Sequence, residues 1–303
     1  MPRPAAALLL LFCTILWGFA FVAQKSAMDE MGALTFAASR YLLGGFLVLP
    51  LALWEYRRRQ RATGYRLSRR HWLLIGALSV NFFLGSWLQQ VGLAFTTVTN
   101  GGFLTALYVL FVPMIAFLAV RARPHPIIYL GIPLALTGIF YLNGGRLDGF
   151  NFGDVLIVLS ALFWGMHVFL LGLLARETGL PIFVSGISFL AAGALSLVFA
   201  LGIESPSIEG LSGGWPQILY AGVLSTAVAF TLQAIGQQYV PAANAAIILS
   251  AEALFAALGG AIVLGERLPL IGYAGTALIF LAILLVEAVP ALQQRRAAAA
   301  ATS

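Results

Sequence analysis

Long apolar stretches separated by short polar segments dominate the chain. Ten stretches of roughly membrane-spanning length lie near residues 6–25, 34–54, 73–94, 100–120, 127–142, 154–175, 182–202, 216–238, 243–264 and 270–289. The apolar runs are continuous rather than alternating, as from Ala5 to Val22, and this favours helices over the strands of a barrel. The pattern therefore predicts an all-α membrane protein with ten transmembrane helices, of which the fifth is short and contains Pro133.

The composition supports a membrane protein. Of 303 residues, 61% are hydrophobic and only 9% are charged, whereas a soluble domain carries about a quarter charged residues. A soluble fold of this length could not hide so much apolar surface. The first stretch is long for a signal peptide and has a counterpart later in the chain, so we interpret it as a retained helix. Cys13 is the single cysteine, which excludes an intrachain disulfide and a thiolate metal site.

The distribution of basic residues predicts an orientation. The formal net charge is +6, and thirteen of the 17 Lys and Arg residues fall in the loops of one side, among them the cluster Arg57–Arg61. Such a bias marks the cytoplasmic side of a membrane, so nucleic-acid binding is not needed to explain the charge. We therefore predict a multi-pass membrane protein with cytoplasmic N- and C-termini.

The chain consists of two internal repeats, residues 1–148 and residues 149–303. A shift of 144 residues overlays the third to fifth stretches on the eighth to tenth, and a shift of 147 overlays the first two on the sixth and seventh. The matched pairs include Trp17 with Trp164, Gln89 with Gln233, Asn100 with Asn244, Tyr108 with Glu252, and Phe111 with Phe255. Because five spans per repeat is an odd number, the second repeat must be inverted, which is the plan of secondary transporters with a site between the halves.

Three short motifs stand out along the chain, namely Leu16-Trp17-Gly18 in the first stretch, Ser39-Arg40-Tyr41 in the second, and Leu264-Gly265-Glu266-Arg267-Leu268 after the ninth. Together they resemble the EamA family of the drug/metabolite transporter superfamily. The resemblance extends over nearly the whole chain. It implies an inner-membrane exporter of metabolites, with amino acids as the best-known substrates. One departure is that Glu252 is followed by Ala253, where the family commonly has proline.

That missing proline raises the question of where the helices bend. We expect a bend at Gly259-Gly260 instead, and a kink at Pro113, which lies inside the fourth stretch. Gly18 and Gly165 follow Trp17 and Trp164, and glycines at such positions let a neighbouring helix approach closely. These five residues are predicted to serve packing or bending.

Glu252 is the most informative candidate for the transport site. A carboxyl group at membrane depth is costly and usually functional. It lies on one helix face with Asn244, and the equivalent face of the fourth stretch carries Tyr108, so the two faces should meet across the pseudo-twofold axis. Glu252 either binds a substrate amine or exchanges a proton, or it pairs structurally with Arg40 or a backbone end.

Two tryptophans and a histidine extend the predicted site. Trp17 and Trp164 offer flat apolar walls for a substrate and can hold an ammonium group by cation–π attraction, or they serve helix packing. His167 lies one turn after Trp164 and is a candidate proton relay, with a structural hydrogen bond as the alternative.

Three amides complete the predicted binding residues, namely Asn81, Gln89 and Gln233. They either recognise a zwitterion or join helices by hydrogen bonds. We interpret Arg40 as structural, with attraction of an anionic group as the less favoured alternative.

The chain lacks nucleotide-binding and hydrolase motifs. We therefore expect that the protein does not use ATP, has no enzymatic activity and needs no cofactor. The favoured hypothesis is export of small metabolites, amino acids first, by alternating access, either facilitated or coupled to protons. Efflux of amphipathic drugs or of another metabolite is the alternative within transport. A membrane receptor or scaffold is the alternative of a different class, and it is disfavoured because little of the chain lies outside the bilayer.

Overall fold

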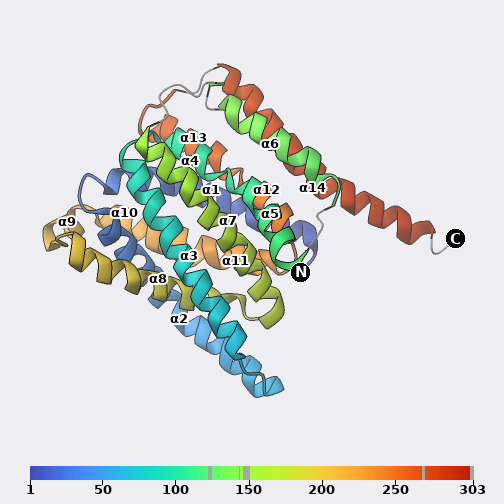
Figure 1. Ribbon diagram of the computed structural model, residues 1–303, viewed down its shortest axis with the longest axis horizontal. Helices are drawn as coiled ribbons and strands as arrows, with labels where there is room; N and C mark the ends of the chain where they lie inside the picture. The colour runs from blue at the N-terminus through green and yellow to red at the C-terminus, as the bar shows by residue number, and fades with distance from the viewer. Residues whose placement is uncertain (122–124, 143, 146–150, 268–269, 301–303) are drawn as a thin grey trace.

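The computed structural model describes residues 1–121, 125–142, 144–145, 151–267 and 270–300, and these residues form helices joined by short connections (Figure 1). The first half contains α1 (Arg3–Ala27), α2 (Ala33–Thr63), α3 (Arg69–Ala94), α4 (Val98–Thr105), α5 (Tyr108–Val120) and α6 (Ile128–Leu142). The second contains α7 (Phe152–Thr178), α8 (Pro181–Ile203), α9 (Ile208–Gly213), α10 (Trp215–Leu219), the π-helix η1 (Tyr220–Phe230), α11 (Thr231–Gln237), α12 (Ala242–Leu249), α13 (Glu252–Val263) and α14 (Leu270–Ala300). The predicted all-α class is confirmed for the described residues.

Eight helical segments within the described residues are long and apolar enough to cross a membrane. They are α1, α2, α3, α4 with α5, α7, α8, α10 through α11, and α12 with α13. The predicted fifth and tenth spans correspond to shorter apolar segments, Ile128–Gly138 and Leu270–Ile279. A helix of the length of α6 covers about 22 Å, less than the thickness of a bilayer core, so the total of ten spans stays a prediction.

The helix α2 extends nine residues beyond the predicted end of the second span. It continues to Thr63, so the basic cluster Arg57–Arg61 lies on its last turns rather than in a loop. Gly64 then ends the helix with a φ of +67°, a left-handed conformation that costs glycine little. The guanidinium of Arg58 lies 5.2 Å from the ring centroid of Trp54, which is an interaction that a helical spacing of four residues provides.

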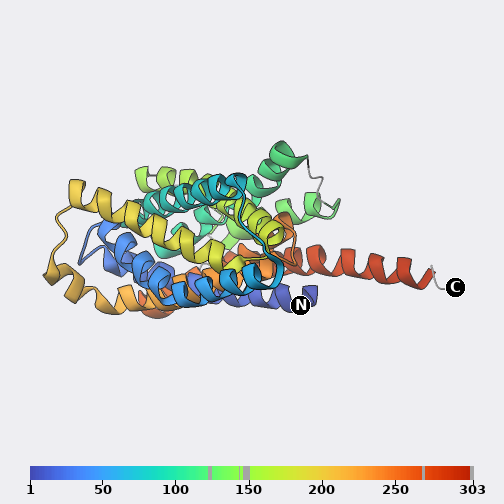
Figure 2. The ribbon, with the colours of Figure 1, turned by 90° about the horizontal axis from the view of Figure 1, so that it is seen from below.

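The two halves pack on one another helix by helix. Residues of α2 pack along α8, α3 along α7, α1 along α13 and α6 along α14, and each pair joins the first half to the second. Figure 1 shows α6 and α14 side by side at one edge of the bundle, and Figure 2 shows the last turns of α14 projecting beyond it. The bundle therefore has its main interfaces between the halves, where the inverted-repeat plan predicts the site.

Glycines at repeat-related positions allow this close packing. A methyl group added to Gly165 would lie 2.9 Å from Cβ of Phe111, and one added to Gly18 would overlap the backbone of Phe255. Phe111 and Phe255 are themselves related by the spacing of 144. One added to Gly259 would lie 3.1 Å from a methyl of Val22. Such small-residue contacts hold membrane helices together where no hydrophobic force acts between them.

Two breaks interrupt the helices of the fourth and ninth predicted spans. They occur at Ala106-Leu107 and Ser250-Ala251, which are again related by 144 residues. Pro113 and Gly259-Gly260 lie within the continuous helices α5 and α13, and the bends expected there stay predictions. At each break the backbone forms a tighter turn with a hydrogen bond over three residues. Leu107 N donates to Leu104 O (3.3 Å), and Ala251 N donates to Ile248 O (3.2 Å). Each break directly precedes one of the two candidate residues Tyr108 and Glu252.

Candidate functional site

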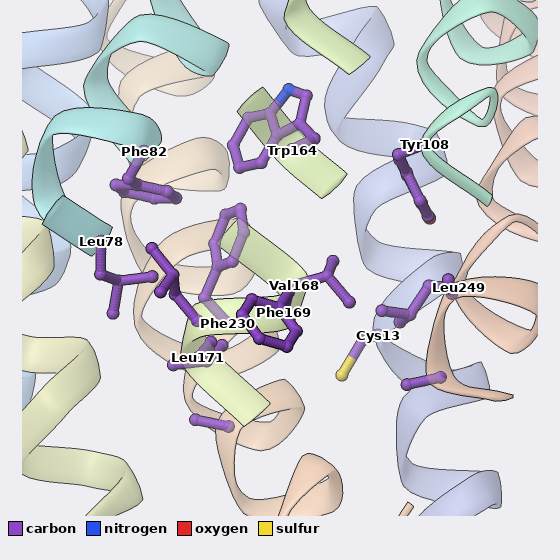
Figure 3. Packing of buried hydrophobic residues seen from close by; sticks show 14 of the residues in the cluster. Cys13, Leu78, Phe82, Tyr108, Trp164, Val168, Phe169, Leu171, Phe230 and Leu249 are labelled. Carbon is purple, nitrogen blue, oxygen red and sulfur yellow. The ribbon is translucent and has the colours of Figure 1, made fainter. Parts of the chain in front are cut away.

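An aromatic cluster occupies the middle of the bundle. The ring centroids of Trp17 and Phe230 are 4.6 Å apart, those of Phe82 and His167 are 5.0 Å apart, and those of Trp164 and Phe230 are 5.8 Å apart. Figure 3 shows Phe82, Phe230 and Trp164 together, with Tyr108 and Leu249 across from them on neighbouring helices. The cluster forms one wall of a cavity between the halves.

This central cavity is enclosed by side chains of both halves. It is lined by Trp17, Phe21, Gln24, Arg40, Gln89, Thr105, Tyr108, Trp164, His167, Val168, Ser225, Phe230, Gln233, Leu249 and Glu252. The space open to the centres of water-sized spheres is about 40 Å³, which is room for about three water molecules. A larger occupant would require the surrounding helices to move.

Every predicted repeat pair of site residues meets in the central cavity. Trp17 and Trp164, Gln89 and Gln233, and Tyr108 and Glu252 all line it, as does His167. The lining also includes two pairs with the same spacings that sequence reasoning missed, Phe21 with Val168 and Thr105 with Leu249. The spacing itself was the signal for these pairs, but their mostly apolar side chains did not stand out among so many similar ones.

Asn81 lies elsewhere and is not part of this lining. Its side-chain Nδ2 donates to the carbonyl of Ala77, one turn earlier on α3, at 2.8 Å. Its repeat counterpart Ser225 does reach the cavity, from the π-helix η1. The π-helix widens the backbone at this point, and π-helical segments are frequent at functional sites.

Both indole N–H groups are already occupied by protein acceptors. Trp164 Nε1 donates to Gln89 Oε1 at 2.7 Å, and Trp17 Nε1 donates to the carbonyl of Ser225 at 3.2 Å. Gln89 Nε2 in turn donates to Gln24 Oε1 at 3.1 Å. The two tryptophans are therefore oriented walls that offer their apolar faces to an occupant, and Gln89 acts as a support for Trp164.

Other polar groups around the cavity have no such partner. Among the described residues, hydrogen-bond partners are lacking for buried atoms of Arg40 (Nε), Tyr108 (hydroxyl), His167 (both ring nitrogens), Gln233 (Oε1) and Glu252 (Oε1). Tyr108 faces Glu252, and His167 lies beside Gln233, without forming hydrogen bonds within ordinary limits. Burial of such groups without partners costs about 1–3 kcal/mol each, so their retention points to a role beyond packing.

The two buried charged side chains of the cavity are not paired with each other. Arg40 is 3% exposed and Glu252 is 5% exposed, and no ion pair joins either of them to another described residue. The Arg40 guanidinium instead contacts the Tyr41 hydroxyl and lies 4.4 Å from the centroid of the Tyr41 ring. The structural interpretation of Glu252 as the partner of Arg40 is therefore not supported, and Arg40, for which the sequence favoured a structural role, lines the cavity.

A multi-pass helical membrane protein whose two halves together line a central cavity has the architecture of a membrane transporter. Comparison with known proteins agrees with this class. The model of the EamA-like transporter family matches residues 4–144 and again residues 151–288. The chain belongs to this family.

Similar chains carry names of the same kind. A chain of Archaeoglobus fulgidus named "Uncharacterized transporter" is 32% identical over 90% of this chain and 82% of its own length. The "Uncharacterized inner membrane transporter YedA" of Escherichia coli is 25% identical over 90% of this chain and 87% of its own. A solved structure titled "Crystal structure of protein" covers 95% of this chain and 98% of its own with a TM-score of 0.73, and at 18% identity it shows the fold alone.

Proposed function

We propose that this transporter exports small zwitterionic metabolites, amino acids first, by alternating access through the central cavity. The observation that carries the proposal is the presence in one cavity of a buried basic and a buried acidic side chain, Arg40 and Glu252, neither of which has an ion-pair partner among the described residues. A zwitterion carries both complementary charges. Its binding would satisfy both groups.

The cavity offers a separate contact for each part of an amino acid. The guanidinium of Arg40 suits a carboxylate, because charge-assisted hydrogen bonds to carboxylates are strong and directional. The carboxyl group of Glu252, with the Tyr108 hydroxyl beside it, suits an ammonium group. The faces of Trp17 and Trp164 suit an apolar side chain, which is why we include aromatic and hydrophobic amino acids among the substrates.

Proton coupling is the second part of the proposal. Glu252 and His167 both lie in the cavity with atoms that lack partners, so either can bind and release a proton when the cavity is exposed to one side and then the other. Without such an exchange the same site would support facilitated diffusion. Efflux of amphipathic drugs is the alternative that the aromatic cluster favours, and a receptor or scaffold would have no use for an enclosed charged cavity.

Counterflow in liposomes tests the proposal. Purified protein is reconstituted with labelled phenylalanine, and three competitors are compared: unlabelled phenylalanine, phenethylamine without the carboxylate, and 3-phenylpropionate without the amine. Competition by phenylalanine alone is expected, because each analogue leaves one buried charge unpaired. If none of a panel of labelled amino acids moves faster than in empty liposomes, amino-acid transport is excluded. Preference for phenethylamine would favour amphipathic cations instead.

A further inference from the structure

Two glutamates join the halves at the end of the molecule where α2 and α4 begin, which we name the clasped end. Glu204, at the end of α8, accepts hydrogen bonds from Leu34 N and Thr35 N, each at 2.8 Å, and from Thr35 Oγ1 at 2.6 Å. A carboxylate at a helix N-terminus satisfies free N–H groups and interacts favourably with the helix dipole. Here the carboxylate comes from the other half of the protein, so the cap is also a connection between halves.

Glu266 makes the same arrangement with α4. Its two oxygens accept hydrogen bonds from Val98 N and Thr99 N, each at 3.0 Å, and Oε2 also accepts from Thr99 Oγ1 at 2.5 Å. Glu266 follows α13 of the second half, and α4 belongs to the first. The clasped end therefore holds two carboxylate caps, each of which must break if the helices separate there.

The backbone around Glu266 is shaped to place it on α4. Gly265 has a φ of +71°, which turns the chain sharply after α13 and which other residues rarely adopt. The N–H of Glu266 donates back to the carbonyl of Gly260 at 3.0 Å. A methyl group on Gly260 would lie 2.6 Å from Glu266 Oε2. The Leu264-Gly265-Glu266 motif thus has a physical role, which is to present this carboxylate to the other half.

At the opposite end of the molecule, one carboxylate cap between the halves lies within the described residues. Glu55 of α2 accepts a hydrogen bond from Phe183 N, at the start of α8, at 2.8 Å, which corresponds to the Glu204 cap. Helix α12, the repeat counterpart of α4, begins after Pro241, whose own side chain makes no cap. The spacing of 144 places alanine, at position 122, where Glu266 has its carboxylate. An alanine side chain cannot accept hydrogen bonds, so this sequence position cannot supply the carboxylate that Glu266 gives α4.

We propose that Glu266 and Thr99 form a latch that holds the clasped end closed and biases the resting transporter toward that state. Helix α4 also carries Thr105 and leads directly into Tyr108, both of which line the central cavity. Release of the latch would therefore free the helix that forms one cavity wall. The inference rests on the proposed alternating access, but it concerns a conformational equilibrium that can be measured without transport.

Distances between two spin labels test the latch. Labels are attached to cysteines replacing Phe95, before α4, and Ile262, on α13; their side chains are 58% and 68% exposed. The background carries Cys13→Ser, so that the buried native thiol does not react. In the Glu266→Gln variant, the NH₂ group of the side-chain amide faces one of the two backbone N–H donors of α4, so the charge-assisted hydrogen bonds of the carboxylate are lost. This loss should raise the population with a longer distance between the labels about tenfold.

Two further variants make the result decisive. Thr99→Val removes the hydroxyl donor at nearly constant volume and should shift the distances in the same direction but less. Glu209→Gln removes an exposed carboxyl group of α9 at the same end and should leave them unchanged. A lower melting temperature with unchanged distances in Glu266→Gln and Thr99→Val would overturn the latch and leave only a structural cap. If the distances shift as expected but no substrate moves, the latch stands and the proposed function fails.

Discussion

Replacement of Glu252 by glutamine should make the protein more stable and less able to respond to protons. The side chain is 5% exposed and has no cationic partner among the described residues. Glutamine has nearly the same size as glutamate but carries no charge. The substitution therefore relieves the desolvation cost of a buried carboxylate, about 1–3 kcal/mol. The new amide remains adjacent to the Tyr108 hydroxyl, which can accept one of its N–H groups.

The gain in stability of the Glu252→Gln variant can be measured by thermal unfolding in detergent. A gain of 1 kcal/mol corresponds to a rise of about 2–4 °C in melting temperature for a domain of 150–250 residues, so a rise of a few degrees is expected for Glu252→Gln. The matched control is Glu209→Gln, an exposed carboxyl group whose loss should change stability by less than about 0.5 kcal/mol. In liposomes, the same Glu252→Gln variant should lose the acceleration that an imposed pH gradient gives the unmodified protein.

Opposite results would refute the reasoning at identifiable steps. A fall in melting temperature for Glu252→Gln would show that the carboxylate is a satisfied structural group, and the functional assignment would fail with it. Equal flux with and without the gradient in the unmodified protein would remove proton coupling and leave facilitated diffusion. A stabilised variant that retains its full response would move the proton exchange to His167.

Three further predictions concern the walls, the packing and the orientation. Trp164→Ala removes an aromatic wall, so the affinity for aromatic substrates should fall about tenfold and the affinity for alanine should fall less. An equal loss of affinity for all substrates, in step with a lower melting temperature, would indicate that Trp164 serves packing alone. Gly18→Val should lower the melting temperature by several degrees, because its side chain would overlap the Phe255 backbone, whereas Gly76→Val, at an open position, should not. A reporter fused after Ser303 should be active only in the cytoplasm, and periplasmic activity would reverse the predicted orientation.

The sequence by itself determined the class of the protein and many of the residues that line its central cavity. Its hydropathy alone predicts membrane helices, because backbone N–H and C=O groups in lipid can form hydrogen bonds only with each other. Its spacings of 144 and 147 residues paired Trp17 with Trp164 and Tyr108 with Glu252, and all four line the central cavity. A repeat can be read from sequence because related positions in the two halves occupy related places in space.

The tertiary structure alone decided which polar groups have partners. Arg40 and Asn81 are both polar residues in apolar stretches, yet Arg40 lines the cavity while Asn81 hydrogen-bonds its own helix. The difference depends on which face of each helix meets the other half, and neighbouring residues do not encode that. The helix break before Glu252 and the contact of Glu266 with Thr99 were likewise invisible in the sequence. The break depends on a local backbone turn, and the contact joins groups 167 residues apart in sequence, which only the folded chain brings together.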